Sequence, residues 1–150
     1  MKIFVGSDHR GFQLKKEVDG ALKELGHEVI DLGTDNETQA CDYPQISLKV
    51  AQAVVKHPGS RGILFCLTGI GHSIAANKVP GVYAALVYNR EAAALCRQHN
   101  DSNVLVLGSK FIDQQSMLDI VKIWLTTEFE GGRHLRRKEQ IQAIEREYSK

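Results

Sequence analysis

The sequence carries almost no net charge, because its 19 lysines and arginines are balanced by 18 aspartates and glutamates, which leaves a formal charge of +1. Proteins that bind nucleic acid or anionic membranes through charge usually need a strong basic excess. We therefore expect neither nucleic acid nor a membrane as a partner. Any anion that this protein binds should be small and held by a few local groups.

Long apolar runs are also missing, since none approaches the roughly 20 residues that a helix needs to span a bilayer. The first residues lead directly into a strand-like segment and show no signal-peptide pattern. From these two features we expect a cytoplasmic protein.

Cysteine is scarce, and its spacing forms no motif. Cys41, Cys66 and Cys96 are an odd number with no CxxC pair, which disfavours both a disulfide framework and a structural zinc site. The 150 residues also contain no internal repeat, low-complexity segment or linker. We expect a single domain over residues 1–150, because a chain of this length can bury roughly 70% of its unfolded surface without such staples.

What is present is an alternation of strand-like and helical patterns. Short β-rich runs occur at 2–6, 28–32, 62–66, 82–87 and 104–107. Helical spacing of apolar residues follows at 14–25, from 44 to the Pro58-Gly59 break, at 90–99 and at 113–128. The β-rich runs at 62–66, 82–87 and 104–107 are apolar throughout, as in strands that are covered on both faces. This pattern predicts an α/β fold: one three-layer α/β/α Rossmann-like domain with a mostly parallel five-stranded sheet and a C-terminal helical extension.

Polar residues follow several predicted strands, at the edge where parallel sheets bind ligands. Ser7-Asp8-His9 follows the first run, residues 66–73 end and follow the third, and Gly108-Ser109-Lys110 follows the fifth. In the second group, Gly69 and Gly71 allow backbone to approach a ligand before a helix begins, which favours an oxyanion or phosphate cradle. The segment is neither a Walker A loop nor a full GxGxxG motif. The alternative is an ordinary tight strand-to-helix connection.

Cys66 lies directly before this cradle, where a helix N-terminus would lower the thiol pKa from about 8.5 and yield a base or nucleophile. The alternative is a small buried hydrophobic residue, which is the more common fate of a free cysteine. Cys41 and Cys96 are interpreted in that second way.

Three further groups each have a functional and a structural interpretation. Asp8 and His9 could bind a hydroxyl or phosphate, or only cap a helix. His99 and Asn100 follow a helix, and the histidine is either an acid or a partner of the helix dipole. The basic segment 133–138 suits a phosphate, or is a solvated basic tail.

Taken together, the motifs resemble the type B ribose-5-phosphate isomerase family, which includes allose-6-phosphate and galactose-6-phosphate isomerases. The resemblance covers nearly the whole chain. It rests on GSDHRGFQLK at 6–15, EVIDLGT at 28–34, DYP at 42–44, CLTGIGHSIAANKVPG at 66–81, RQHNDSNVLVLGSK at 97–110 and EGGRHLRR at 130–137.

The resemblance implies an aldose–ketose isomerisation through an enediolate, with no cofactor and no metal. It makes Cys66 the base between C1 and C2, Thr68 an aid to proton movement between the oxygens, and His99 the group that opens the furanose ring. The substrate-binding residues that it implies are Asp8, His9, Asp42, Tyr43, Leu67, Gly69, Ile70, Gly71, Asn100, Lys110, Arg133, His134 and Arg137. It further implies a homodimer that shares its sites between subunits, and a possible dimer of dimers.

Two positions depart from the family pattern. Leu67 stands where the family usually has glycine, and Lys110 where it usually has arginine. The resemblance makes ribose 5-phosphate the expected substrate, and these two departures leave a six-carbon aldose phosphate as the close alternative. A catalytically weak sugar-phosphate binder is a further alternative. A thiol phosphatase is disfavoured, because its Cys-x5-Arg motif would need arginine where His72 stands.

Overall fold

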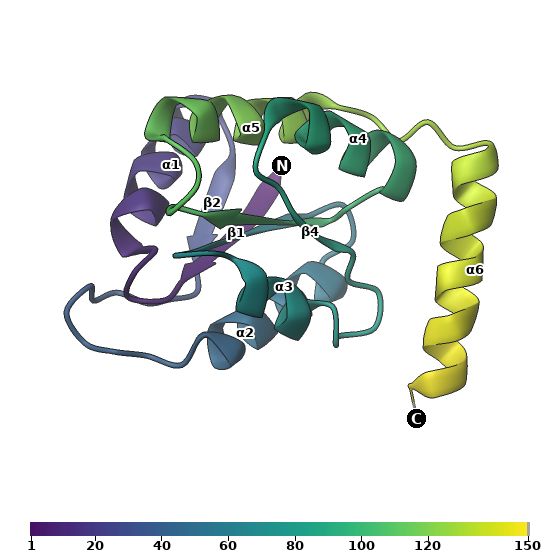
Figure 1. Cartoon of the computed structure of the whole chain (residues 1–150), viewed down its shortest axis with the longest axis horizontal. Helices are drawn as coiled ribbons and strands as arrows, with labels where there is room; N and C mark the ends of the chain where they lie inside the picture. Colours follow the sequence, from purple (N-terminus) through teal and green to yellow (C-terminus); the bar gives the residue numbers. More distant parts are fainter. Residues whose placement is uncertain (150) are drawn as a thin grey trace.

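Figure 1 shows a computed structural model of the chain, which describes residues 1–149. Strands and helices alternate along it before a last helix, α6, that stands apart from the sheet. The elements are β1 (Lys2–Ser7), α1 (Phe12–Glu24), β2 (Glu28–Asp31), α2 (Tyr43–Lys56), β3 (Arg61–Cys66), α3 (Ile70–Ala76), β4 (Ala84–Leu86), α4 (Arg90–Asn100), β5 (Val104–Gly108), α5 (Gln114–Thr126) and α6 (Arg133–Tyr148).

All five strands are parallel, in the order β2-β1-β3-β5-β4. Helices α1, α4 and α5 cover one face of the sheet, and α2 and α3 cover the other (Figure 1). The chain reverses its direction across the sheet between β1 and β3, so the carboxyl ends of these strands flank a topological switch point. In open α/β sheets, ligands bind at such a point. The predicted three-layer α/β/α fold is confirmed.

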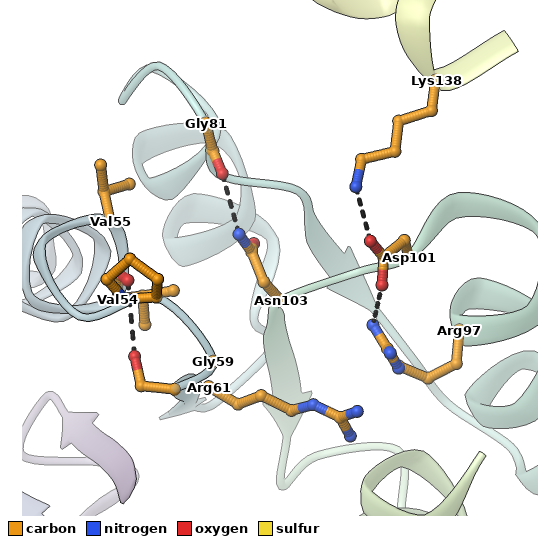
Figure 2. Close-up of a pocket in the computed structure, with 11 residues that line it drawn as sticks. Val54, Val55, Gly59, Arg61, Gly81, Arg97, Asp101, Asn103 and Lys138 are labelled. Carbon is orange, nitrogen blue, oxygen red and sulfur yellow. Dashed lines mark hydrogen bonds and ion pairs between the residues drawn. The ribbon is translucent and has the colours of Figure 1, made fainter. Parts of the chain in front are cut away.

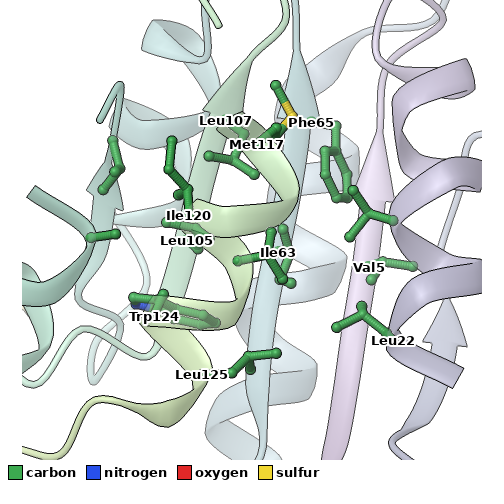
Figure 3. Close-up of a cluster of buried hydrophobic side chains, with 14 of the residues drawn as sticks. Val5, Leu22, Ile63, Phe65, Leu105, Leu107, Met117, Ile120, Trp124 and Leu125 are labelled. Carbon is green, nitrogen blue, oxygen red and sulfur yellow. The ribbon is translucent and has the colours of Figure 1, made fainter. Parts of the chain in front are cut away.

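A buried cluster on each face fixes the sheet in this arrangement. On one face, Met117, Ile120 and Trp124 recur at helical spacing along α5 and pack over β3 and β5 (Figure 3). On the other face, Val50 and Val54 of α2 belong to a second cluster. Gly6 and Gly62 make that contact possible, because an added Cβ would lie 2.9 Å and 2.7 Å from Val50 methyl groups.

Two predictions from the sequence, one about a strand and one about the burial of two cysteines, were wrong. The run 82–87 was expected to be a strand covered on both faces, but β4 is a three-residue edge strand whose residues are all partly exposed. The apolar run came instead from Val82 and Val87, which are buried in the connections on either side of it. Cys41 and Cys96 were expected to be buried, but both keep intermediate exposure.

No helix within residues 1–149 is long and apolar enough to cross a membrane.

Candidate active site

Cys66 and Asp8 meet at the carboxyl edge of the sheet, because β3 and β1 are neighbours and both end there. The Cys66 thiol donates to Asp8 Oδ2 at 3.3 Å. The other carboxylate oxygen, Oδ1, accepts from the backbone N–H groups of Arg10 at 3.0 Å and Gly11 at 2.9 Å. Asp8 thus orders the turn before α1, although the helix itself has no side-chain cap, and its contact with the thiol is a role that the sequence analysis did not predict.

The expected lowering of the Cys66 pKa is wrong in direction. Burial raises the pKa of this thiol, and so does the neighbouring Asp8 carboxylate, while backbone N–H groups of Gly69 and Thr68 oppose the rise. Only 8% of Cys66 is exposed, so its thiolate would lose most of its hydration. The resting thiol is therefore protonated, and Asp8 is the acceptor beside it.

The predicted cradle lies directly beyond Cys66. Gly69 adopts φ +84°, a left-handed conformation that glycine allows, and it is the residue before α3. Thr68 turns its side-chain oxygen toward the start of α3, where Oγ1 accepts from the Ile70 N–H at 3.3 Å. Its carbonyl accepts from the Tyr88 hydroxyl at 2.7 Å.

Two further glycines lie closely against this segment, one on either side. A Cβ on Gly11 would lie 2.3 Å from the Phe65 carbonyl oxygen, and one on Gly108 would lie 2.3 Å from the Thr68 carbonyl oxygen. Such distances are far inside van der Waals contact. The position of residues 65–68 therefore depends on the absence of side chains at both glycines.

His72 is a residue of this site that the sequence reasoning did not single out. It is fully buried on α3, and its Nδ1 lies 2.6 Å from the Ser47 hydroxyl oxygen. Burial lowers its pKa to about 4, although Asp8 opposes this change, so the ring is neutral. The only signal in the sequence was a histidine one turn beyond Gly69, in a helix face that is otherwise apolar.

The remaining residues predicted at this edge differ in how they are held. His9 Nδ1 accepts from the Cys41 N–H at 3.4 Å, which ties β1 to the segment before α2. Tyr43 packs its ring against Gly71 and lies edge-on to His72, with ring centroids 5.6 Å apart. Leu67 is partly exposed, and the exposed residues are Asp42, Tyr43, Ile70 and Lys110.

A second cluster gathers the other predicted residues. The rings of His99 and His134 are stacked, with centroids 4.2 Å apart and 11° between their planes. Glu130 lies 3.4 Å from His134 Nε2. Burial lowers the pKa of His134, and so do the neighbouring His99 and Arg133, while Glu130 opposes the change. A cavity of about 210 Å³ is lined here by His99, Asn100, His134, Arg137, Lys138 and Ile141.

This histidine cluster and Cys66 lie at opposite edges of the sheet. Helix α4 starts after the carboxyl end of β4 and returns to the start of β5, so His99 lies at the amino edge. Helix α6 starts at the same edge, where the Glu130 N–H donates to the Gln98 carbonyl at 3.1 Å. The six residues of β3 separate the two edges by roughly 20 Å, at about 3.3 Å per residue. Within one chain, the predicted site residues therefore form two separate groups, one at each edge of the sheet.

A further cavity of about 400 Å³ lies on the other side of Lys138 (Figure 2). Asp101 accepts there from Arg97 Nη1 at 2.8 Å and from Lys138 Nζ at 2.5 Å. Arg61 donates to the carbonyls of Trp124 and Leu125, at 2.8 Å and 3.0 Å. The three cations around this cavity already have acceptors, which makes it a poorer anion site than the cradle.

The sequence of this chain is similar to those of known proteins. The model of the family described as Ribose/Galactose Isomerase matches residues 3–141. The chain belongs to this family. Ribose-5-phosphate isomerase B of Escherichia coli is 47% identical over 144 residues, 96% of each protein. This isomerase chain also has the expected α/β fold of the family.

Solved structures agree over nearly the full length of the isomerase chain. Ribose-5-phosphate isomerase B of Clostridium thermocellum matches with a TM-score of 0.96 and 50% identity, over 99% of this chain and 100% of that one. The Mycoplasma genitalium enzyme, solved with bound ribulose-5-phosphate, matches with a TM-score of 0.94 and 45% identity, over 97% of each chain. The resemblance drawn from the motifs is thus confirmed at the level of the family.

Proposed function

We propose that this isomerase interconverts ribose 5-phosphate and ribulose 5-phosphate, and that residues 1–150 form its single domain. The observation that carries the proposal is the buried Cys66 thiol, hydrogen-bonded to Asp8 beside a glycine-containing cradle. Two similar proteins support the substrate: the Escherichia coli relative by its name, and the Mycoplasma genitalium structure by its bound ribulose-5-phosphate.

The reaction requires one proton to move between C2 and C1 of the open-chain sugar. In the proposed mechanism, Asp8 accepts the thiol proton as substrate binds, and the Cys66 thiolate removes the C2 proton to give an enediolate. The same thiol then returns the proton to C1. Thr68 assists the proton exchange between the two oxygens. Backbone N–H groups of the cradle stabilise the developing negative charge, an effect worth about 3–4 kcal/mol per donor in other enzymes.

The opening of the furanose ring and much of the phosphate binding require the histidine cluster. We assign ring opening to His99, and phosphate binding to Arg133 and Arg137 together with His9. Because His99 and Cys66 of one chain lie at opposite edges of the sheet, His99, Arg133 and Arg137 must come from a second copy. The proposed active form is therefore at least a homodimer with shared sites.

The function is tested by assaying phosphorylated aldoses for conversion to ketoses, without added metal or nucleotide. Cys66→Ala should abolish both turnover and solvent-deuterium exchange at the substrate carbon, while sugar-phosphate affinity stays within a few-fold. Exchange at the wild-type rate in this variant would remove Cys66 from the role of base. Binding without turnover in the wild type would favour a sugar-phosphate binder.

The shared site is tested by mixing two inactive proteins. One carries Cys66→Ala, and the other carries Arg133→Ala and Arg137→Ala. In a heterodimer, one site would contain both defects and the other would be intact, so activity should return to the mixture. Verified heterodimers that remain inactive would contradict sharing.

A six-carbon aldose phosphate is the second candidate substrate. It is favoured by Leu67, whose side chain directly follows the proposed base and is partly exposed at the cradle. The same panel of aldoses decides between the two, through the ratio of kcat/KM for five-carbon and six-carbon substrates.

A further inference from the structure

His72 has a ring nitrogen without a hydrogen-bond partner in a fully buried position. The Ser47 hydroxyl oxygen lies 2.6 Å from His72 Nδ1 and 3.1 Å from the Tyr43 carbonyl oxygen, so Ser47 holds one edge of the ring. The other ring nitrogen is Nε2. Within residues 1–149, that atom is buried and has no hydrogen-bond partner. A buried polar atom of this kind is unfavourable unless something binds to it.

Two more potential metal ligands lie beside this histidine. Single ligand atoms of His72, Cys66 and Asp8 all lie within 4.8 Å of one another, and the three residues are buried. The Cys66 thiol donates to Asp8. The three side chains therefore bring a sulfur, a carboxylate oxygen and an imidazole nitrogen to one buried point.

The donor set and its surroundings match a site for a borderline-soft cation. Thiolate, imidazole and carboxylate are the protein ligands that Zn²⁺ takes, at bonds of about 2.0–2.3 Å. Metal-binding histidines generally donate their other ring N–H to an oriented acceptor, and the Ser47 hydroxyl oxygen lies in that position, 2.6 Å from His72 Nδ1. The second oxygen of Asp8 is likewise held, by the N–H groups of Arg10 and Gly11. The supporting hydrogen bonds of a metal site are thus present.

We propose that Asp8, Cys66 and His72 form a Zn²⁺ site in this protein. Binding breaks the S–H bond of Cys66, forms a sulfur–zinc bond and releases the proton to solvent. Three protein ligands leave a fourth position open, toward the side where Cys66 and Asp8 keep 8% and 6% exposure. Bound zinc occupies the sulfur electron pair that takes the substrate proton, so it acts as a reversible inhibitor. This last consequence rests on the proposed function, whereas the site itself does not.

Cobalt binding tests the site without any assay of activity. Co²⁺ titrated into the wild-type protein should give a sulfur-to-cobalt charge-transfer band that saturates at one ion per chain and disappears when Zn²⁺ is added. Cys66→Ala should lack the band. His72→Leu should bind Co²⁺ at least about tenfold more weakly, in line with the loss of a metal-supporting group. A second group, His99, Glu130 and His134, contains no thiol and cannot produce this band.

Controls make each outcome decisive. His27→Gln, at a partly exposed histidine beside the N-terminal amine, should leave the band unchanged. If His72→Leu does not fold, Ser47→Ala takes its place, because it removes the hydrogen bond that orients His72 and should also weaken Co²⁺ by about tenfold or more. No band in the wild type, or equal affinity in the folded His72 or Ser47 variant, would overturn the site.

The inhibitory effect is measured separately, with each variant compared to its own metal-free rate. Zn²⁺ should inhibit the wild-type isomerisation, and a chelator should restore it, while His72→Leu should need at least about tenfold more zinc. A cobalt band without any sugar-phosphate turnover would support the site and reject the proposed function. Turnover without a cobalt band would support the proposed function and reject the zinc site. A zinc-loaded protein that remains active would overturn the proposed inhibition.

Discussion

Replacement of Asp101 by Asn should loosen the attachment of α6 to the domain. The carboxylate joins Arg97 of α4 to Lys138 of α6, at 2.8 Å and 2.5 Å. Side-chain exposure is 7% for Arg97, 18% for Lys138 and 30% for Asp101. Asp101 also has φ 51°, a left-handed conformation that asparagine tolerates well. The substitution therefore removes charge with little change in backbone preference.

The expected loss lies between two limits. Exposed ion pairs contribute about 0–1 kcal/mol, whereas breaking a fully buried pair costs about 3–5 kcal/mol. This network is partly buried, and the amide would turn an NH₂ group toward one of the two cations. We expect Asp101→Asn to lower the free energy of unfolding by about 1.5–3 kcal/mol, the range for hydrogen bonds to charged groups.

The effect should depend on pH with a definite sign. Burial by itself would raise the pKa of Asp101, but the hydrogen bonds and charges of Lys138 and Arg97 outweigh it, so the folded pKa is below its ordinary value. The carboxylate therefore stabilises the fold above its unfolded pKa of about 3.9, and this contribution disappears as pH falls through the lower folded value. The difference between wild type and variant should shrink in acid.

Urea unfolding at fixed chain concentration, from pH 7 down to pH 3, measures this difference. Asp19→Asn is the matched control, since its partner Lys23 is mostly exposed and the pair is spaced i,i+4. That control should lose at most about 0.5 kcal/mol. If Asp101→Asn cost no more than the control at pH 7, or if its cost did not shrink in acid, the reasoning from the network would be refuted.

Three further predictions concern the site and the core. Gly108→Ala should destabilise the fold by about 1–3 kcal/mol through overpacking against the Thr68 carbonyl, and it should reduce activity. The control Gly20→Ala, with open space around its Cβ, should stabilise α1 by about 0.5–1 kcal/mol. Chemical denaturation measures both changes, and equal effects on stability would show that the contact with the Thr68 carbonyl does not matter. Leu67→Gly should change the ratio of kcat/KM for five-carbon and six-carbon aldose phosphates by at least about tenfold, and a constant ratio would show that its side chain does not face the sugar. Ile120→Ala, at a fully buried position of α5, should lower the free energy of unfolding by about 2–5 kcal/mol. A loss below about 1 kcal/mol would show that the surrounding side chains collapse to fill the cavity.

The layered fold was predictable because its signals are local. Apolar runs placed all five strands, and helical spacing placed α1, α2, α4 and α5, whereas α3 was expected only as the helix after Gly69 and Gly71. Strand order was not predictable, because it depends on contacts between segments far apart in sequence, such as Ile3 beside Arg61 and Gly62 beside Val104. Strand β4 was overextended because burial of Val82 and Val87 in turns gives the same pattern as burial in a strand.

The site was only partly predictable for the same reason. The sequence placed Cys66 and Asp8 at the ends of two different strands, and the structure shows their contact. The spacing could not show that burial outweighs the backbone N–H groups and raises the Cys66 pKa. It also could not show that Ser47, on α2, orients His72, on α3. Both results depend on how separate elements pack.

The two outer strands have a consequence for aggregation. Sheet edges with long, unpaired strands invite further strands to add to them, and proteins commonly prevent this with short or charged edges. Here β4 has three residues, and β2 has four, with Glu28 and Asp31 at its ends. The sheet offers few free backbone groups for growth at either side. Ordered association of these chains should therefore proceed through helix surfaces, such as the exposed Ile141, Ile144 and Tyr148 of α6.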